Sequence, residues 1–196
     1  SGDIVISCYK GLPVTAIERN AFINSNITSV TFNTTELKSI DYYAFKGCSN
    51  LTKVVIPEGV TSIGDMAFNG CSKLKSIQFP NSIVTIGAGA FYGCKKLADS
   101  NGMVIVGNVL CGYYGIESNV NIPDGVIRID DKAFSECSGL VKIALPESVV
   151  SIGRNAFYNC KNLRSAQIPS SVTDIGENAF WGCENLADDE GFVIIH

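Results

Sequence analysis

The sequence predicts a repeat solenoid built mainly from short β-strands. Three observations support this fold class: a fixed spacing of Ala-Phe pairs, an apolar pattern that returns at the same place in each repeat, and a proline directly after one of two strand-like segments. The stretch "SIGDMAFNGCSKLKSIQFP" (62–80) returns, for example, as "SIGRNAFYNCKNLRSAQIP" (151–169). Stacked copies of such a unit bury one continuous core, which a single copy could not do.

The repeat has a period of 23 residues. Successive Ala-Phe pairs lie 23 residues apart except for one interval of 43. The seven pairs begin at Ala21, Ala44, Ala67, Ala90, Ala133, Ala156 and Ala179. One period over 1–196 predicts a single solenoid of about seven coils.

Each repeat contains two short extended segments. In the unit that starts at Leu51, "LTKVVIP" alternates around Val54 and Ile56, and "VTSIG" is a second extended piece that ends in glycine. A proline such as Pro57 follows the first segment, where it can end strand pairing without removing an interior hydrogen bond. The Ala-Phe segment is predicted to be a short turn or 3₁₀ stretch that closes the coil.

The 43-residue interval predicts an inserted β-hairpin at 98–117. Its apolar runs "MVIV" and "VLCGYY" are separated by Gly107-Asn108, a sequence typical of a hairpin turn. Tyr113 and Tyr114 would either pack in this insertion or contact a partner. The chain ends on "LADDEGFVII", which parallels "LADSNGMVIV" and predicts the start of a second hairpin. We therefore expect 1–196 to be a fragment of a longer repeat array, or to end with half a hairpin as a cap.

Composition and charge argue against several functions. Hydrophobic residues make up 46% of the chain, charged residues 17%, and the net charge is −4, without a basic run for nucleic acid or anionic lipid. No apolar run approaches the roughly 20 residues of a membrane-spanning helix. The only histidine is His196, so imidazole-dependent nucleophiles and Cys-His zinc sites are not expected. The sequence predicts no enzyme, cofactor or metal site.

With these residues set out, the chain resembles the BspA-like leucine-rich repeats, the 23-residue bacterial type. The matching pattern is L-x-x-[IV]-x-[IFL]-P-x-x-[VI]-x-x-I-[GD]-x-x-A-F-x-x-C over residues 14–186. Asn33, Ser25 and Ala166 depart from it at the proline, cysteine and isoleucine positions. The resemblance implies a right-handed superhelix with a parallel sheet on its concave side. It also implies an extracellular or cell-surface location and adhesion to host matrix proteins or other cells.

Six of the eight cysteines occupy one repeat position: Cys48, Cys71, Cys94, Cys137, Cys160 and Cys183. They lack the close C-x₂-C pairs of most cysteine metal sites. Disulfides between neighbouring coils are sterically allowed, but equivalent side chains of a solenoid all point into the core. We favour a ladder of small buried side chains, in which Ser25 is the first member. Cys8 and Cys111 lie outside it and are the better candidates for a bond or for reactivity.

The outward side of the first strands is the main candidate for binding. Residues on either side of the central apolar position point away from the core. They form two rows of small or polar groups: Ser29 and Thr31, Lys53 and Val55, Ser76 and Gln78, Asn119 and Asn121, Lys142 and Ala144, Ser165 and Gln167. Solenoids commonly bind along such an extended surface. The alternative is a solvated face that binds nothing.

A second candidate is the position after each phenylalanine. Tyr92, Tyr158 and Trp181 would form either an exposed aromatic strip or rings partly buried against the next coil. The acidic pairs Asp130-Asp131 and Asp188-Asp189 are predicted to lie in solvated turns, since nothing near them resembles a Ca²⁺ loop. Asn26, Asn33 and Asn50 begin glycosylation sequons, which matter only in a eukaryotic secretory pathway.

These observations predict a non-enzymatic binding or adhesion module. Its partner would be a protein or glycan, such as an extracellular matrix protein, held by many weak contacts on a rigid surface. The alternative is a structural stalk or spacer with no ligand of its own.

Overall fold

The computed structural model describes residues 2–186, and the contacts divide the chain into two compact units, Ser1–Leu97 (unit 1) and Ala98–His196 (unit 2). The chain is a β-solenoid of about seven turns with parallel sheets and almost no helix. The predicted fold class is therefore confirmed, whereas one continuous solenoid over 1–196 stays a prediction. The second hairpin expected at the end of the chain lies outside the described residues.

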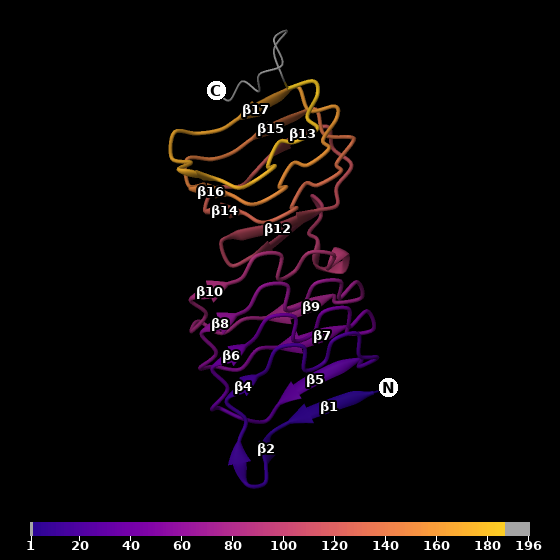
Figure 1. Cartoon of the computed structure of the whole chain (residues 1–196), viewed down its shortest axis with the longest axis vertical. Helices are drawn as coiled ribbons and strands as arrows, with labels where there is room; N and C mark the ends of the chain where they lie inside the picture. Colours follow the sequence, from indigo (N-terminus) through magenta and orange to yellow (C-terminus); the bar gives the residue numbers. More distant parts are fainter. Residues whose placement is uncertain (1, 187–196) are drawn as a thin grey trace. The chain divides into compact units, whose positions relative to one another are not determined.

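Unit 1 carries two four-stranded parallel sheets, seen on its two sides in Figure 1. The first segment of each coil supplies one sheet, in the order β1 (Asp3–Ile6), β5 (Ser29–Phe32), β7 (Lys53–Val55) and β9 (Ser76–Gln78). The second segment supplies the other, made of β4 (Ala16–Ile17), β6 (Ser39–Ile40), β8 (Ser62–Ile63) and β10 (Thr85–Ile86). Both predicted segments are thus strands. A short antiparallel hairpin of β2 (Cys8–Tyr9) and β3 (Leu12–Pro13) was not predicted.

Unit 2 repeats this plan with the hairpin added. Its first segments form a three-stranded parallel sheet of β13 (Asn119–Asn121), β15 (Lys142–Ala144) and β17 (Ser165–Gln167). The other sheet has five strands: β11 (Met103–Val106), β12 (Val109–Tyr113), β14 (Arg128–Ile129), β16 (Ser151–Ile152) and β18 (Asp174–Ile175). The antiparallel pair β11–β12 turns at Gly107-Asn108, as predicted.

The inserted hairpin also forms part of a coil, because its second strand occupies the place of a repeat strand. Strand β12 pairs in parallel with β14, and Leu110 lies opposite Ile129. The Tyr113 N–H donates to the Ala133 carbonyl (2.8 Å). One coil later the Phe134 N–H makes the equivalent bond to the Ala156 carbonyl. The Tyr113 ring also stacks on Phe134 at 5.1 Å and is buried. Tyr113 therefore occupies the phenylalanine position of a shortened coil, which decides its role for packing.

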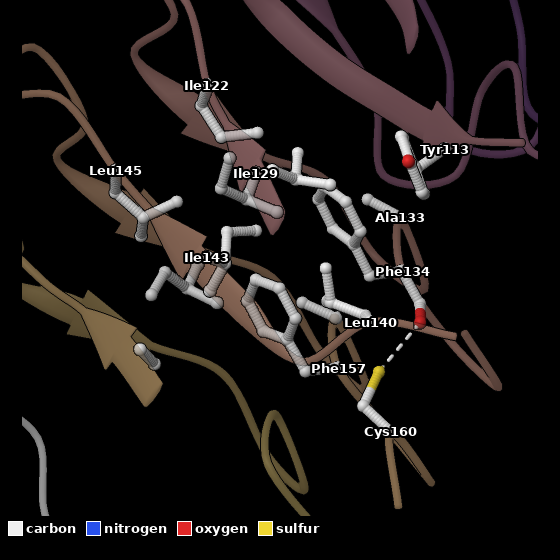
Figure 2. Packing of buried hydrophobic residues seen from close by; sticks show 14 of the residues in the cluster. Tyr113, Ile122, Ile129, Ala133, Phe134, Leu140, Ile143, Leu145, Phe157 and Cys160 are labelled. Atoms are coloured by element: carbon white, nitrogen blue, oxygen red, sulfur yellow. Dashed lines mark hydrogen bonds between the residues drawn. The ribbon is translucent and has the colours of Figure 1, made fainter. Parts of the chain in front are cut away.

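The core of each unit is a set of side-chain ladders that run from coil to coil. The Ala-Phe phenylalanines stack nearly parallel, for example Phe134 on Phe157 at 5.0 Å and 13°, and Phe157 on Phe180 at 5.0 Å and 8°. Figure 2 shows the Phe134 and Phe157 rings beside Ile129, Ile143 and Leu140. Each such ring pair adds about 0.5–1.5 kcal/mol beyond the burial of its area.

The Ala-Phe segment is a chain of hydrogen-bonded turns, one of the two predicted forms. In the coil of Ala156, the Ala156 N–H donates to Gly153 and the Tyr158 N–H to Asn155, each at a spacing of three residues. Asn155 and Asn159 have positive φ, which asparagine tolerates better than most residues. The 3₁₀ helix of the described part of the chain, η1 (Lys95–Leu97), lies after such a segment rather than in it.

The glycine that ends the second segment is required by close approach of the backbone. A Cβ on Gly153 would lie 2.6 Å from the Asp131 nitrogen in the preceding coil. Asp130 has the equivalent position in its own coil. The coil before it is the shortened one, which the hairpin forms and which has its corner at Tyr113. The Asp130 side chain is buried, with 1% exposure, and pairs with Arg128 at 3.5 Å. The prediction that Asp130 lies in a solvated turn is therefore wrong. Asp189 and its neighbour Asp188 lie outside the described residues.

Candidate binding face

The two predicted rows of side chains lie on two separate sheets. We call the outward sides of β1-β5-β7-β9 and of β13-β15-β17 face 1 and face 2. Strand register aligns the rows, since Lys53 lies opposite Ser29 and Ser76, and Lys142 opposite Asn119 and Ser165. Neighbouring strands lie about 4.8 Å apart. Side chains at equivalent repeat positions therefore follow one another at that spacing along each face.

Burial alternates along these strands as the sequence predicts. Val54 and Ile143 are fully buried, whereas Lys53 and Lys142 beside them are exposed. Of the predicted row residues, Thr31, Lys53, Val55, Ser76, Gln78, Asn119, Asn121, Lys142 and Gln167 are exposed, and Ser29, Ala144 and Ser165 are half-buried. Their placement follows the prediction, and their part in binding stays a prediction.

Face 1 contains one more strand than the sequence indicated. Strand β1 pairs in parallel with β5, so Asp3 joins the row of Ser29 and Val5 joins the row of Thr31. The hydroxyls of Ser29 and Thr28 donate to the Asp3 carboxylate at 2.7 and 2.9 Å, and these bonds lower the pKa of Asp3. The alternation in "DIVI" was the available signal, but this segment lacks the Ala-Phe and proline marks of a repeat.

The proposed aromatic strip is divided between the units. Tyr158 and Trp181 stack at 4.8 Å and 12° in unit 2, and Trp181 remains 56% exposed. Tyr158 is half-buried, and so is Tyr92, which belongs to unit 1. The strip is thus a nearly parallel stack of two rings in unit 2, partly buried as the alternative interpretation predicted.

A cluster of cations and aromatic rings in unit 1 was missed. The Arg19 guanidinium lies 5.0 Å from the centre of the Tyr42 ring, and the Lys46 ammonium lies 4.0 Å from that of Tyr43. The two tyrosines are half-buried and stack on each other. Arg19 lies one 23-residue period before Tyr42, so the repeat period was the signal that could have placed these two side chains together.

All eight cysteines are free thiols, and five of them hydrogen-bond along the stack. Each of the five Sγ atoms donates to the carbonyl of the phenylalanine one coil earlier, at 3.0–3.2 Å: Cys48 to Phe22, Cys71 to Phe45, Cys94 to Phe68, Cys160 to Phe134 and Cys183 to Phe157. Figure 2 shows the bond from Cys160 to Phe134. The favoured packing ladder is therefore confirmed, with a hydrogen bond that was not foreseen.

The remaining cysteines differ from the ladder. Cys137, whose preceding corner is the one at Tyr113, is half-buried, and burial raises the pKa of its thiol to about 11. Cys111 is buried, and Cys8 is exposed beside an open pocket lined by Pro13, Asn33 and Glu36. The predicted reactivity thus falls to Cys8 alone.

The described residues show no cluster of three or more His, Cys, Asp or Glu side chains placed to hold a metal ion. Within residues 2–186, no helix has the length and hydropathy needed to cross a membrane.

Comparison with protein families gave one match. Six copies of the BspA type leucine rich repeat match residues 13–102 and 107–190. A comparison with curated proteins gave no match.

Solved structures with a similar fold come from several bacteria. A leucine rich repeat protein of T. pallidum is 29% identical, with a TM-score of 0.57 over 95% of this chain and 78% of that one. A leucine rich cell surface protein of Faecalibacterium prausnitzii is 28% identical, with a TM-score of 0.50 over 95% and 69% of the two chains. The pneumococcal vaccine antigen PcpA, at 19% identity and a TM-score of 0.56 over 95% and 61%, shares the fold alone.

Proposed function

Because the chain belongs to the BspA-type leucine-rich repeat family, we propose that it is a non-enzymatic binding module of a secreted or cell-surface protein. Faces 1 and 2 would be the contact surfaces, and a protein or glycan such as a matrix component would be the partner. A solved relative described as a cell surface protein supports the location.

The exposed rows on a rigid sheet are the observation that carries this proposal. Their strands are joined in register by parallel pairing, as β9 is to β7 and β17 is to β15. Side chains such as Gln78 and Gln167 are therefore presented at fixed spacing, and binding orders little backbone. Each polar contact is weak alone, so affinity would come from many contacts and from several copies of the module.

The test is a binding screen of the whole chain against matrix proteins, mucins and glycans, with a row variant. This variant carries Lys53→Ala, Gln78→Ala, Lys142→Ala and Gln167→Ala, all at exposed positions. We expect it to bind its partner at least about 10-fold more weakly, because four contacts of a few tenths of a kcal/mol each are removed. Surface plasmon resonance measures the change.

A matched control carries four exposed substitutions outside the rows: Lys38→Ala, Asn81→Ala, Lys161→Ala and Ser170→Ala. It should keep wild-type affinity. Equal binding by the row variant and wild type would refute the proposed face. A screen without any binding above background would leave the stalk or spacer as the function.

A further inference from the structure

Charge is unevenly divided between the two units. Residues 1–97 contain nine basic and six acidic side chains, a net charge of +3, whereas residues 98–196 contain six basic and thirteen acidic ones, a net charge of −7. Unit 1 is therefore positively charged although the net charge of the whole chain is −4. The distribution of its lysines decides what this charge can do.

Four lysines of unit 1 gather at the edge of face 1. Lys53 lies on β7 opposite Ser76 of β9, and Lys75 directly precedes Ser76. The Lys75 N–H donates to the Thr52 carbonyl, which places Lys75 one coil after the residue next to Lys53. Lys73 reaches back one coil to donate to Asn50 Oδ1 at 2.8 Å, and Lys96 has the equivalent repeat position in η1, which packs on β9. We call Lys53, Lys73, Lys75 and Lys96 the lysine patch.

The lysine patch is not neutralised by neighbouring carboxylates. All four side chains are exposed, and none forms an ion pair within the described part of the chain. Asp3, the acidic residue of face 1, lies two strands from Lys53 and accepts bonds from Ser29 and Thr28. The patch therefore keeps an uncompensated positive field over the edge of the sheet.

We propose that the lysine patch binds an acidic polysaccharide, a glycan chain with sulfate or carboxylate groups. This inference deepens the proposed function and rests on it. A single exposed lysine–anion contact is worth about 0–1 kcal/mol, so only a polymer that repeats its charges can engage several lysines with useful affinity. The neighbouring Asn50, Thr52 and Ser76 offer amide and hydroxyl groups that suit uncharged sugar hydroxyls.

The same surroundings disfavour nucleic acid. Single-stranded nucleic acid binds where bases stack on aromatic rings, and phosphates favour the guanidinium fork of arginine. The lysine patch holds neither group, and Arg19, the arginine of unit 1, lies over Tyr42 at a corner segment. A flexible ammonium group makes no demand on the shape of the anion, which suits an irregularly charged glycan.

The experiment compares dextran sulfate with neutral dextran and with a DNA duplex, using the whole chain and titration calorimetry or surface plasmon resonance. We expect dextran sulfate to bind at 50 mM NaCl and neutral dextran not to bind. Four lysine–anion contacts that each release about 0.7 counterion predict an affinity about 50-fold lower at 200 mM than at 50 mM NaCl. Absence of binding to dextran sulfate at 50 mM NaCl, or DNA binding of equal strength, would overturn the proposal.

A patch variant removes the three lysines that lie outside the rows: Lys73→Gln, Lys75→Gln and Lys96→Gln. Its matched control, Lys38→Gln, Lys132→Gln and Lys161→Gln, changes the net charge equally. We expect the patch variant to lose at least about 10-fold in affinity for dextran sulfate and the control less than about 3-fold. Equal losses would show that net charge alone acts, and would overturn the patch.

The two proposals can fail separately. The patch variant keeps Gln78 and Gln167, so it should still bind an uncharged partner found in the screen of faces 1 and 2. Binding of such a partner without binding of dextran sulfate refutes the lysine patch and leaves the proposed function intact. Unchanged circular dichroism shows that both variants are folded.

Discussion

At the scale of single residues, the cysteine position shows how one side chain serves two neighbouring coils. Cys94 is fully buried, and its thiol donates to the Phe68 carbonyl at 3.2 Å. That carbonyl also accepts the N–H of Cys71 in its own coil. Cysteine is small, apolar and a weak donor, so it fills the site and satisfies the second lone pair. Ser25 takes the place of this cysteine in the coil of Phe22.

Burial of these thiols makes stability fall at alkaline pH. Burial raises the pKa of Cys94 to about 12, against about 8.5 for an unfolded cysteine. The neutral thiol's stabilisation is complete below about pH 8.5 and is lost as the pH rises toward 12, because the unfolded chain releases its proton first. The slope is about −1.4 kcal/mol per pH unit for this one group.

The substitution Cys94→Ala tests this. The difference in unfolding free energy between wild type and variant should shrink by about 1.2 kcal/mol from pH 9 to pH 10, measured by urea denaturation in the presence of a reductant. Cys8→Ala, at an exposed position, is the control and should show a constant difference. A difference that does not change with pH for Cys94→Ala contradicts the buried thiol.

At the scale of elements, the corner after the second strand decides how closely coils stack. A Cβ added to Gly153 or to Gly64 would lie 2.6 Å from a backbone nitrogen of the preceding coil. Where the preceding corner differs, at Asp130, the glycine is replaced and the carboxylate is paired with Arg128. Aspartate also stands at this position at Asp41, so glycine is required only where the backbone of the preceding coil comes this close.

Gly153→Ala should therefore be strongly destabilising, by about 2–4 kcal/mol, because the new methyl group meets backbone that cannot move alone. Gly139→Ala is the matched control in the same unit, since its Cβ would meet nothing within 4 Å and its φ is ordinary. We expect that control to stay within about 0.5 kcal/mol of wild type or to gain slightly. Urea denaturation measures both, and equal effects would contradict the close approach.

At the scale of the whole molecule, each coil contacts mainly its neighbours. In such a solenoid, stability is the sum of local terms, and a defect acts most strongly near its own coil. Phe45 and Phe157 are matched probes, since both are fully buried and each stacks between two phenylalanines at 5.0–5.2 Å. Trp181, the single tryptophan of the chain, reports on unit 2.

Each substitution, Phe45→Ala or Phe157→Ala, should cost about 3–5 kcal/mol in its own unit. We expect Phe157→Ala to lower the urea midpoint seen by Trp181 fluorescence more than Phe45→Ala does. Equal shifts would show that residues 1–196 unfold as one cooperative body, and would support the single continuous solenoid predicted from the period.

The sequence by itself determined the coil. A period of 23 residues places Ala, Phe and Cys in ladders, and strict alternation around Val54 or Ile143 decides which neighbours face the solvent. Both patterns can be read from one or two neighbouring repeats, because each coil folds in the same way wherever it lies in the stack. The buried ladders and the exposed rows were predictable for that reason.

The tertiary structure decided what depends on two coils at once. Tyr113 enters the phenylalanine ladder and Asp130 is buried because a shortened corner lies beside them. Asp3 and Val5 join face 1 through pairing with a strand 26 residues away. Lys53 and Lys73 belong to the repeat 51–73, and Lys75 and Lys96 to the repeat 74–96, and the stacking of these two repeats brings their charges to one place. Alternation within one coil cannot show such neighbours, because it describes each coil without the one next to it.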